Sequence, residues 1–287
     1  MTLSLPIETS GASAAFRSRA GKGSKKIGRN WLEFWKRHPH TAAGERLYAI
    51  GDIHGRADLL EQMLAAIWDD MARTDDGRNA RMVFLGDLID RGPDSKTVLS
   101  LVLDLTRTQN AICLLGNHEQ LLLNALMGDK ASLKGWLKLG GWQTLKSYDD
   151  SRKKKKESDL EYAMRLAESI PRAHIEFLES LPTSYRSGTY FLAHAGVRPG
   201  VKLKKQDPHD LVWIRKPFLE TQEDLGAIVI HGHSVVDNVT FFNNRIAVDT
   251  QAWKSGKLSC VRLAGEGCSV IFAKKKSVKT IPIWSED

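Results

Sequence analysis

Five short clusters of polar residues along the chain carry the residue types of a metal site. Each cluster combines glycine with aspartate, asparagine or histidine, and each directly follows a run of four or five apolar residues. Glycine beside a polar side chain lets the backbone turn sharply and approach a ligand closely. The clusters occupy residues 51–55, 86–92, 116–119, 194–199 and 231–234.

The side chains in these clusters offer carboxylate, amide and imidazole donors and no thiolate. That mixture suits a pair of divalent ions such as manganese, iron or zinc. Two such ions about 3.5–4 Å apart can activate water and clamp a phosphoryl group for in-line attack. The candidate donors are Asp52, His54, Asp87, Asn117, His194 and His233.

Each cluster taken alone also has a structural explanation. An Asp-x-His after a strand is commonly a satisfied turn, and residues 117–119 can simply cap the helix that follows. A histidine at the end of a strand, such as His194, can be hydrogen-bonded without binding a ligand. The coincidence of five clusters in equivalent positions favours the metal site over these alternatives.

The apolar runs and the segments between them predict the elements that position the clusters. Helical spacing over residues 60–71 predicts one helix, and Asp94 is a good N-cap for a second that continues to Val102. Alternation of strands and helices predicts an α/β sheet, whose functional groups gather beyond the carboxyl ends of the strands. Short runs bounded by turn residues are typical of buried strands, here residues 47–50, 82–85, 111–115, 190–193 and 227–230.

The chain divides into a basic tail and one large domain. Residues 1–45 hold eight Lys or Arg and three Glu, so they carry +5 of the net charge of +8. Their Gly/Ser-rich part has few large apolar residues, which predicts disorder. Residues 46–287 are expected to form the domain, with residues 130–182 as a helical insertion. The lysine run Lys153–Lys156 in that insertion is expected in a solvated surface loop, although it could bind an acidic partner.

Composition excludes several classes of protein. Hydrophobic residues make up 42% and charged residues 26%, as in ordinary globular chains. No stretch approaches the ~18 apolar residues of a membrane span, and the N-terminus lacks the pattern of a secretory signal. Three widely spaced cysteines without a CxxC pair favour reduced thiols and a cytoplasmic location.

Taken together, the clusters resemble the phosphoprotein phosphatase family of calcineurin-like metallophosphoesterases, in its bacterial branch. Residues 51–55, 86–92 and 116–119 match the three diagnostic motifs of that family in order, and His194 and residues 232–234 match its later, weaker motifs. The resemblance extends from about residue 46 to residue 263. It implies an α/β fold in which a central β-sandwich of mixed sheets is flanked by helices and carries a helical insertion.

The resemblance also implies a role for each candidate ligand. One metal would be held by Asp52, His54 and Asp87, and Asp87 would bridge to the second metal. Asn117, His194 and His233 would complete the second site, and Asn117 would also contact the substrate phosphate. Manganese is the expected ion in vitro, with iron and zinc as alternatives.

Further residues match the acid and the phosphate-binding positions of the family. His118 resembles the general acid that protonates the departing alkoxide, and Asp90 would orient it. Arg91 and Arg215, the latter in a Trp-x-Arg pattern, resemble the arginines that bind phosphate oxygens with forked donors. Arg198 is a weaker candidate for the same role, because a surface arginine before Pro199 explains it equally well.

Three positions depart from the family pattern or leave it open. Gln251 stands where relatives usually have glycine after Asp-Thr, so the turn there is expected to differ. Ser234 replaces a commoner threonine. His231 lies two residues from His233 and could compete with it as a ligand.

The implied reaction is removal of phosphate from phosphoserine or phosphothreonine in proteins by direct attack of a metal-bridging hydroxide. A symmetrical dinucleoside tetraphosphate hydrolase shares the same ligands and is the alternative; phosphotyrosine and small phosphoesters are also open as substrates. A non-catalytic basic binding module is disfavoured, because every ligand position is filled. No specific nucleic-acid partner is expected, and the sequence leaves the oligomeric state open.

Overall fold

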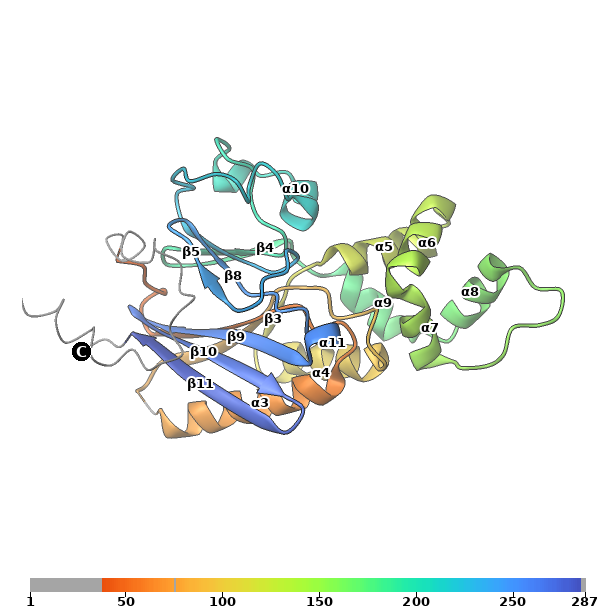
Figure 1. The fold of residues 1–287 in the computed structure, drawn as a ribbon, viewed down its shortest axis with the longest axis horizontal. Coiled ribbons are helices and arrows are strands. Elements are labelled where there is room, and N and C mark those ends of the chain that lie inside the picture. Colours follow the sequence, from red (N-terminus) through yellow and green to blue (C-terminus); the bar gives the residue numbers. More distant parts are fainter. Residues whose placement is uncertain (1–37, 75, 285–287) are drawn as a thin grey trace, which may run out of the picture.

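The computed structural model describes residues 38–74 and 76–284 (Figure 1). The basic tail predicted for residues 1–45 therefore lies mostly outside the described residues. No helix among the described residues is long and apolar enough to cross a membrane.

Two mixed sheets form the centre of the described chain. The larger, sheet A, has the strand order β11-β10-β9-β1-β2-β3; β1, β2 and β3 are parallel, and β9, β10 and β11 are antiparallel to their neighbours. Its strands are β1 (Glu45–Ile50), β2 (Asn79–Phe84), β3 (Ile112–Cys113), β9 (Lys257–Ala264), β10 (Gly267–Lys274) and β11 (Ser277–Trp284).

The smaller sheet, sheet B, has the order β4-β5-β6-β8-β7. Its three central strands β5, β6 and β8 are parallel, and the outer strands β4 and β7 are antiparallel to them. Its strands are β4 (Ser184–Ser187), β5 (Tyr190–Ala193), β6 (Ile228–His231), β7 (Thr240–Phe241) and β8 (Arg245–Ala247).

Alternating side chains of β1 explain how the layers pack. Leu47 and Ala49 belong to a buried cluster shared with sheet B, which includes Leu192 and Ile230. Tyr48 and Ile50 point to the opposite face and pack in the cluster formed with the helices. Because successive side chains of a strand face opposite sides, this fully apolar run is buried between sheet B and the helical layer.

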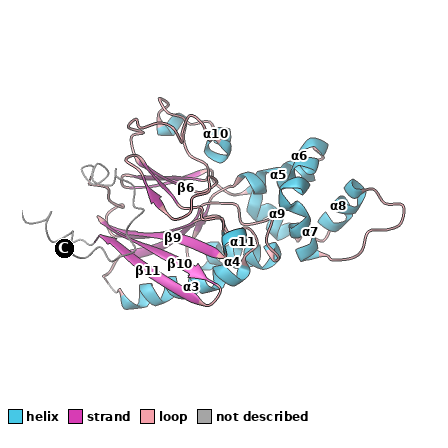
Figure 2. Ribbon diagram, viewed as in Figure 1, coloured by secondary structure: helices cyan, strands magenta, loops and turns pink. Residues whose placement is uncertain are grey.

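Helices cover the outer face of sheet A and gather at one end of the sandwich. In Figure 2 the helices α5 to α9 form a group beside the strands. The prediction for Asp94 is confirmed, since its side chain accepts a hydrogen bond from Thr97 N. The helices near the sheets are α3 (Ala57–Arg73), α4 (Ser95–Thr108), α5 (Asn117–Leu126), α10 (Pro208–Trp213) and α11 (Ala252–Ser255).

The segment from residue 130 to residue 182 is helical in the structure, around a loop that exposes Ser151–Lys156. A turn with π-helical hydrogen bonding, η1, joins its first two helices and contains Gly140 at φ 119°. Its elements are α6 (Lys130–Trp136), η1 (Leu137–Gly141), α7 (Trp142–Tyr148), α8 (Asp159–Ala167) and α9 (Arg172–Glu179).

The predicted fold class, an α/β sandwich of mixed sheets with flanking helices, is confirmed. One strand is shorter than predicted, because β3 spans only Ile112–Cys113 instead of residues 111–115. Ala111 N donates to Leu105 O at the end of α4, and Leu115 N donates to Pro182 O. These contacts draw both ends of the run away from the ladder.

Candidate metal centre and acid site

The polar clusters meet because they follow the carboxyl ends of parallel strands in two facing sheets. His54 and Asp87 come from the loops after β1 and β2, and Asn117 begins α5 after β3. His194 and His233 come from the loops after β5 and β6 in sheet B. Such ends are where open α/β sheets place their ligand sites, and the two sheets here contribute to one site.

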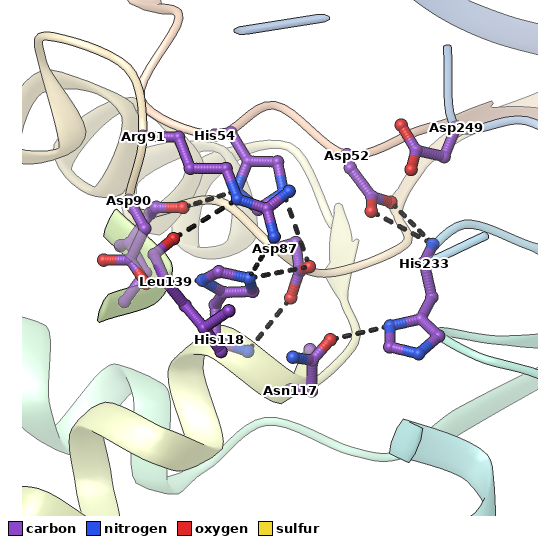
Figure 3. A network of polar contacts seen from close by, with 12 residues as sticks. Asp52, His54, Asp87, Asp90, Arg91, Asn117, His118, Leu139, His233 and Asp249 are labelled. Carbon is purple, nitrogen blue, oxygen red and sulfur yellow. Dashed lines mark hydrogen bonds and ion pairs between the residues drawn. The ribbon is translucent and has the colours of Figure 1, made fainter. Parts of the chain in front are cut away.

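Asp87 lies at the centre of this site (Figure 3). Its carboxylate oxygens are 3.6 Å from His54 Nε2 and 3.4 Å from His194 Nε2, and one accepts from His118 N. Burial would raise the pKa of Asp87, but the surrounding histidines lower it well below its usual range. Two groups of side chains with ligand atoms within 4.8 Å share this residue: His54, Asp87 and His118, and Asp87, His194 and His233.

Asn117 and Asp52 lie on the side of the site near His233. Asn117 Oδ1 is 3.0 Å from His194 Nε2 and 2.7 Å from His233 Nδ1. The Asp52 carboxylate accepts from His233 N at 3.0 and 3.3 Å and belongs to neither of the two groups. Burial, the neighbouring Asp249 and Asp87 raise the pKa of Asp52. The structure therefore brings five predicted ligands together and places Asp52 beside them, where a cation would relieve the repulsion between buried carboxylates.

The histidines are held in the form that binds cations. Nδ1 of His54 is 2.8 Å from Ile89 O, and Nδ1 of His194 is 2.9 Å from Leu85 O. A carbonyl oxygen can only accept, so Nδ1 carries the proton and the Nε2 lone pair faces Asp87, as in metal-binding histidines. Burial lowers the pKa of His54 to about 3 and also lowers that of His194, which keeps both imidazoles neutral.

His233 also has a side chain that can bind a cation. Its Nε2 is buried and has no hydrogen-bond partner among the described residues. Burial, followed by the neighbouring His194, lowers the pKa of His233 to about 2. Neutral imidazoles, an ionised carboxylate and an amide oxygen form a donor set that fits two divalent cations with nitrogen and oxygen ligands.

His118 and Asp90 form a buried pair next to this centre. His118 Nδ1 is 2.5 Å from Asp90 Oδ2. Burial lowers the pKa of His118, but the carboxylates of Asp87 and Asp90 outweigh it, so the net shift is upward. A raised pKa suits an imidazole that donates a proton near neutral pH.

The Arg91 guanidinium lies between the centre and this pair. Nη1 is 2.9 Å from His54 Nε2, and Nη2 is 2.9 Å from His118 Nε2. Nε2 of His54 has one lone pair, so it can either accept a hydrogen bond from Arg91 or bind a cation. The two Nη atoms of Arg91 lie next to both histidines, where they could donate to the oxygens of a bound phosphate.

The remaining candidates are placed less centrally. The exposed Arg215 approaches the site through Nη2, 3.4 Å from His233 O. Arg198 is exposed and donates to both carboxylate oxygens of Asp210 at 2.5 Å, which supports the alternative explanation of a surface arginine. His231 packs its ring against Phe218 and joins neither ligand group.

Several residues around the site adopt left-handed backbone conformations, which glycine adopts freely and which strain most other residues. Gln251 replaces the expected glycine and takes φ 55°, and its N–H donates to Asp249 Oδ1 at 2.7 Å. Gln251 therefore adopts a left-handed conformation that glycine would take without strain. Strain of this kind concentrates at functional sites, and here it also affects His54, Asp87, Asp90, Arg91 and His233.

Glu119 has a structural role that the sequence analysis did not assign. Its buried carboxylate accepts from Asp87 N at 2.9 Å, Leu88 N at 2.8 Å and Gly116 N at 3.0 Å. Burial and the nearby Asp87 raise the pKa of Glu119 to about 7. The residue ties the loop after β2 to the start of α5, and its place at the third helical position after Gly116 is the signal that could have revealed this.

Comparison with known proteins identifies the family. The match to the family described as calcineurin-like phosphoesterase covers residues 45–270. The chain belongs to the calcineurin-like phosphoesterase family. The resemblance stated from the sequence is thereby confirmed, and the chain is a metallophosphoesterase. Members of this family use a dinuclear metal site, and the two ligand groups that share Asp87 agree with such a site.

Relatives within the family carry two kinds of name. The chain is 27% identical over 232 residues to "Bis(5'-nucleosyl)-tetraphosphatase PrpE [asymmetrical]" of Anoxybacillus flavithermus, covering 74% of this chain and 88% of that protein. It is 27% identical over 240 residues to "Serine/threonine-protein phosphatase 1" of Salmonella typhimurium, covering 82% and 94%. A solved structure described as a putative diadenosine tetraphosphatase has a TM-score of 0.54 and 22% identity, with 86% of this chain and 99% of that chain covered.

These names correct one expectation. The alternative expected from the sequence was a symmetrical dinucleoside tetraphosphate hydrolase. The tetraphosphatase relatives are named asymmetrical, so the comparison supports an asymmetrical tetraphosphatase as the alternative. The metal ligands alone could not distinguish the two, because both reactions use the same donors.

Proposed function

We propose that this metallophosphoesterase is a protein phosphatase that removes phosphate from phosphoserine and phosphothreonine. The proposal depends on one observation: the buried His118–Asp90 pair lies beside the ligand groups. The Arg91 guanidinium contacts His118 of this pair and the candidate ligand His54. A serine or threonine alkoxide is a poor leaving group and needs a proton as it departs. The departing phosphate of a polyphosphate needs that proton less.

Each side chain then has a defined part in the reaction. Asp52, His54 and Asp87 would hold one divalent cation; Asp87, Asn117, His194 and His233 would hold the other. When bound, the cations supply Lewis acidity and an activated water. Arg91 binds phosphate oxygens with its fork, Arg215 reaches them from the rim, and Asn117 adds an amide contact.

His118 completes the reaction by delivering a proton from its imidazole to the leaving oxygen, while Asp90 holds Nδ1 and fixes the ring. No covalent phosphoenzyme is required, because water is the nucleophile. The product alcohol is the dephosphorylated side chain.

Hydrolysis of asymmetrical dinucleoside tetraphosphates is the second candidate, and one structural feature favours it besides the relatives. A surface cavity of about 820 Å³ borders Arg91. Trp253 lines it with an indole whose Nε1 has no partner among the described residues, and Arg91 lies 5.6 Å from the centre of its ring. A nucleoside leaving from the phosphate could stack there.

The test compares substrates on one preparation. The protein is supplemented with manganese, iron or zinc and given a phosphoserine peptide, a phosphotyrosine peptide and diadenosine tetraphosphate. We expect the highest kcat/KM on the phosphoserine peptide. A higher value on the tetraphosphate would support the second candidate, with ATP and AMP as products, whereas two ADP would indicate symmetrical cleavage.

The location is proposed to be cytoplasmic on the basis of the cysteines. Cys113, Cys260 and Cys268 are all buried and unpaired, as expected in a reducing compartment.

A further inference from the structure

The carboxylate of Asp90 is held from three directions, and two of its partners come from the helical insertion. Besides His118, Trp136 Nε1 donates to both carboxylate oxygens at 3.0 and 2.8 Å. Thr144 Oγ1 donates to Asp90 Oδ1 at 2.6 Å. All four side chains are buried. Because an ionised carboxylate has about four acceptor sites, these contacts leave it little freedom to rotate.

The main chain of Asp90 is held by the same threonine. Asp90 N donates to Thr144 Oγ1 at 2.8 Å and to Ser95 Oγ at 3.0 Å. Asp90 has φ 75°, a conformation that costs energy for a residue other than glycine. Thr144 therefore binds both the strained backbone of Asp90 and the carboxylate that points at His118.

The neighbouring Arg91 is seated by the turn between Trp136 and Thr144. Arg91 N donates to Gly140 O and Arg91 Nε donates to Leu139 O, each at 3.3 Å. Figure 3 shows Leu139 against the Arg91 side chain. Gly140 has φ 119°, and a Cβ at this position would lie 2.7 Å from Arg91 N, so the close approach requires glycine.

We propose that Trp136 and Thr144 are positioning residues for proton delivery by His118. They fix the Asp90 carboxylate, and Asp90 in turn fixes the imidazole. The insertion is then part of the catalytic machinery as well as a surface around the site. This inference depends on the proposed use of His118 as an acid, and it does not depend on which phosphoester is the physiological substrate.

The test separates proton delivery from general structure by the leaving group. The variants are Trp136→Phe, which removes the indole N–H, and Thr144→Val, which removes the hydroxyl with little change in shape. They are assayed on phenyl phosphate, whose leaving group needs a proton, and on 4-nitrophenyl phosphate, whose leaving group departs as a stable anion. Thr144→Ser is the conservative variant. Trp142→Phe is the matched control, because Trp142 lies in the same insertion and packs on Tyr162.

We expect Trp136→Phe and Thr144→Val to lower kcat on phenyl phosphate by about 10-fold to 100-fold, a fraction of the full contribution of a general acid. The loss on 4-nitrophenyl phosphate is expected to stay within about twofold, with KM unchanged on both. Thr144→Ser keeps the hydroxyl and should retain most of the wild-type rate. Trp142→Phe should match the wild type on both substrates.

Equal losses on the two substrates, or no loss in either variant, would overturn the inference. Circular dichroism checks folding; if Trp136→Phe does not fold, the nearly isosteric Thr144→Val decides the question. Failure of the proposed function looks different: the wild type would hydrolyse the aryl phosphates and leave the phosphoserine peptide intact.

Discussion

Asp87 lies between histidines from the two sheets that are far apart in the sequence. His54 reaches it from the loop after β1 in sheet A, and His194 reaches it from the loop after β5 in sheet B. A carboxylate in this position can face two cations at once, which a histidine with one free nitrogen cannot. Removal of its charge is therefore the most direct test of the shared centre.

Replacing Asp87 with Asn is expected to abolish turnover and to reduce the bound metal. Asn tolerates the left-handed φ of 52° at this position, so the loop should keep its shape while losing the charge. Metal content is measured by elemental analysis after manganese loading, next to turnover of 4-nitrophenyl phosphate. The control is Asp207→Asn at the exposed N-cap of α10. Retention of both metal and rate would contradict the bridging role.

His118→Asn is expected to lower kcat by about 10²–10⁴, the usual contribution of a general acid. The reason is loss of the proton donor, so the effect should be large on a phosphoserine peptide and smaller on 4-nitrophenyl phosphate. Metal content should stay at the wild-type level, because the proposed ligands are unchanged. A uniform loss on both substrates, or loss of metal, would show that His118 acts as a ligand, which its membership of a ligand group with His54 and Asp87 also permits.

For single residues, the sequence predicted those that belong to a recognisable motif. It did not predict those that reach the site only through tertiary packing. The resemblance of the motifs to the phosphatase family predicted roles for His118, Asp90 and Arg91. Trp136 and Thr144 lie 46 and 54 positions from Asp90, and no local pattern links a tryptophan or a threonine to a carboxylate that far away. Their role follows from the way the insertion folds back.

Among the elements, the insertion docks on α4 through a buried histidine. His174 Nδ1 is 2.6 Å from the hydroxyl of Tyr148 in α7, and its Nε2 is 3.3 Å from Ser100 Oγ in α4. Burial lowers the pKa of His174; Lys96 on α4 lowers it further and Asp104 opposes this. The neutral ring therefore joins α9 to two neighbouring helices.

The pH dependence of stability follows from the direction of this shift. The unfolded chain, with a histidine pKa of about 6.5, takes up a proton more readily than the folded chain. Stability from His174 is thus present above about pH 6.5 and is lost as the pH falls toward the folded value. The free energy of unfolding is measured by urea denaturation at pH 7.5 and at pH 5.5. From the higher to the lower pH it should fall more for the wild type than for His174→Gln. The exposed His209→Gln is the control, and parallel losses in all three proteins would refute the prediction.

The strands also show which elements the pattern of apolar residues did not predict. The apolar runs before the polar clusters were predicted as strands because the strands are parallel and buried on both faces. The antiparallel strands β9, β10 and β11 follow no metal-ligand cluster and were not predicted. In β9, successive side chains do not alternate between buried and exposed, because both faces of this strand are covered.

In the whole molecule, a short segment ahead of β1 ties the two sheets together. Thr41 N donates to Gly265 O, and Gly265 N donates to Thr41 Oγ1, in the turn between β9 and β10 of sheet A. On the other side, Ala42 N donates to Ser187 Oγ, and His40 exchanges hydrogen bonds with Thr189, next to β4 and β5 of sheet B. The tail predicted for residues 1–45 therefore ends in residues that contact the domain.

Two truncations separate this segment from the residues before it. A chain that begins at residue 38 should keep the wild-type melting temperature and kcat/KM on 4-nitrophenyl phosphate, because it retains every described contact. A chain that begins at residue 44 loses the six hydrogen bonds that join this segment to Ser187, Thr189 and Gly265. Each such bond is worth about 0.5–1.5 kcal/mol net, and each kcal/mol lowers Tm by about 2–4 °C in a domain of this size. We expect its Tm to fall by at least about 5 °C while its turnover at low temperature persists, since the segment contacts no proposed ligand. Equal melting temperatures would show that the segment does not join the sheets, and a loss of activity in the longer chain would place a catalytic contribution before residue 38.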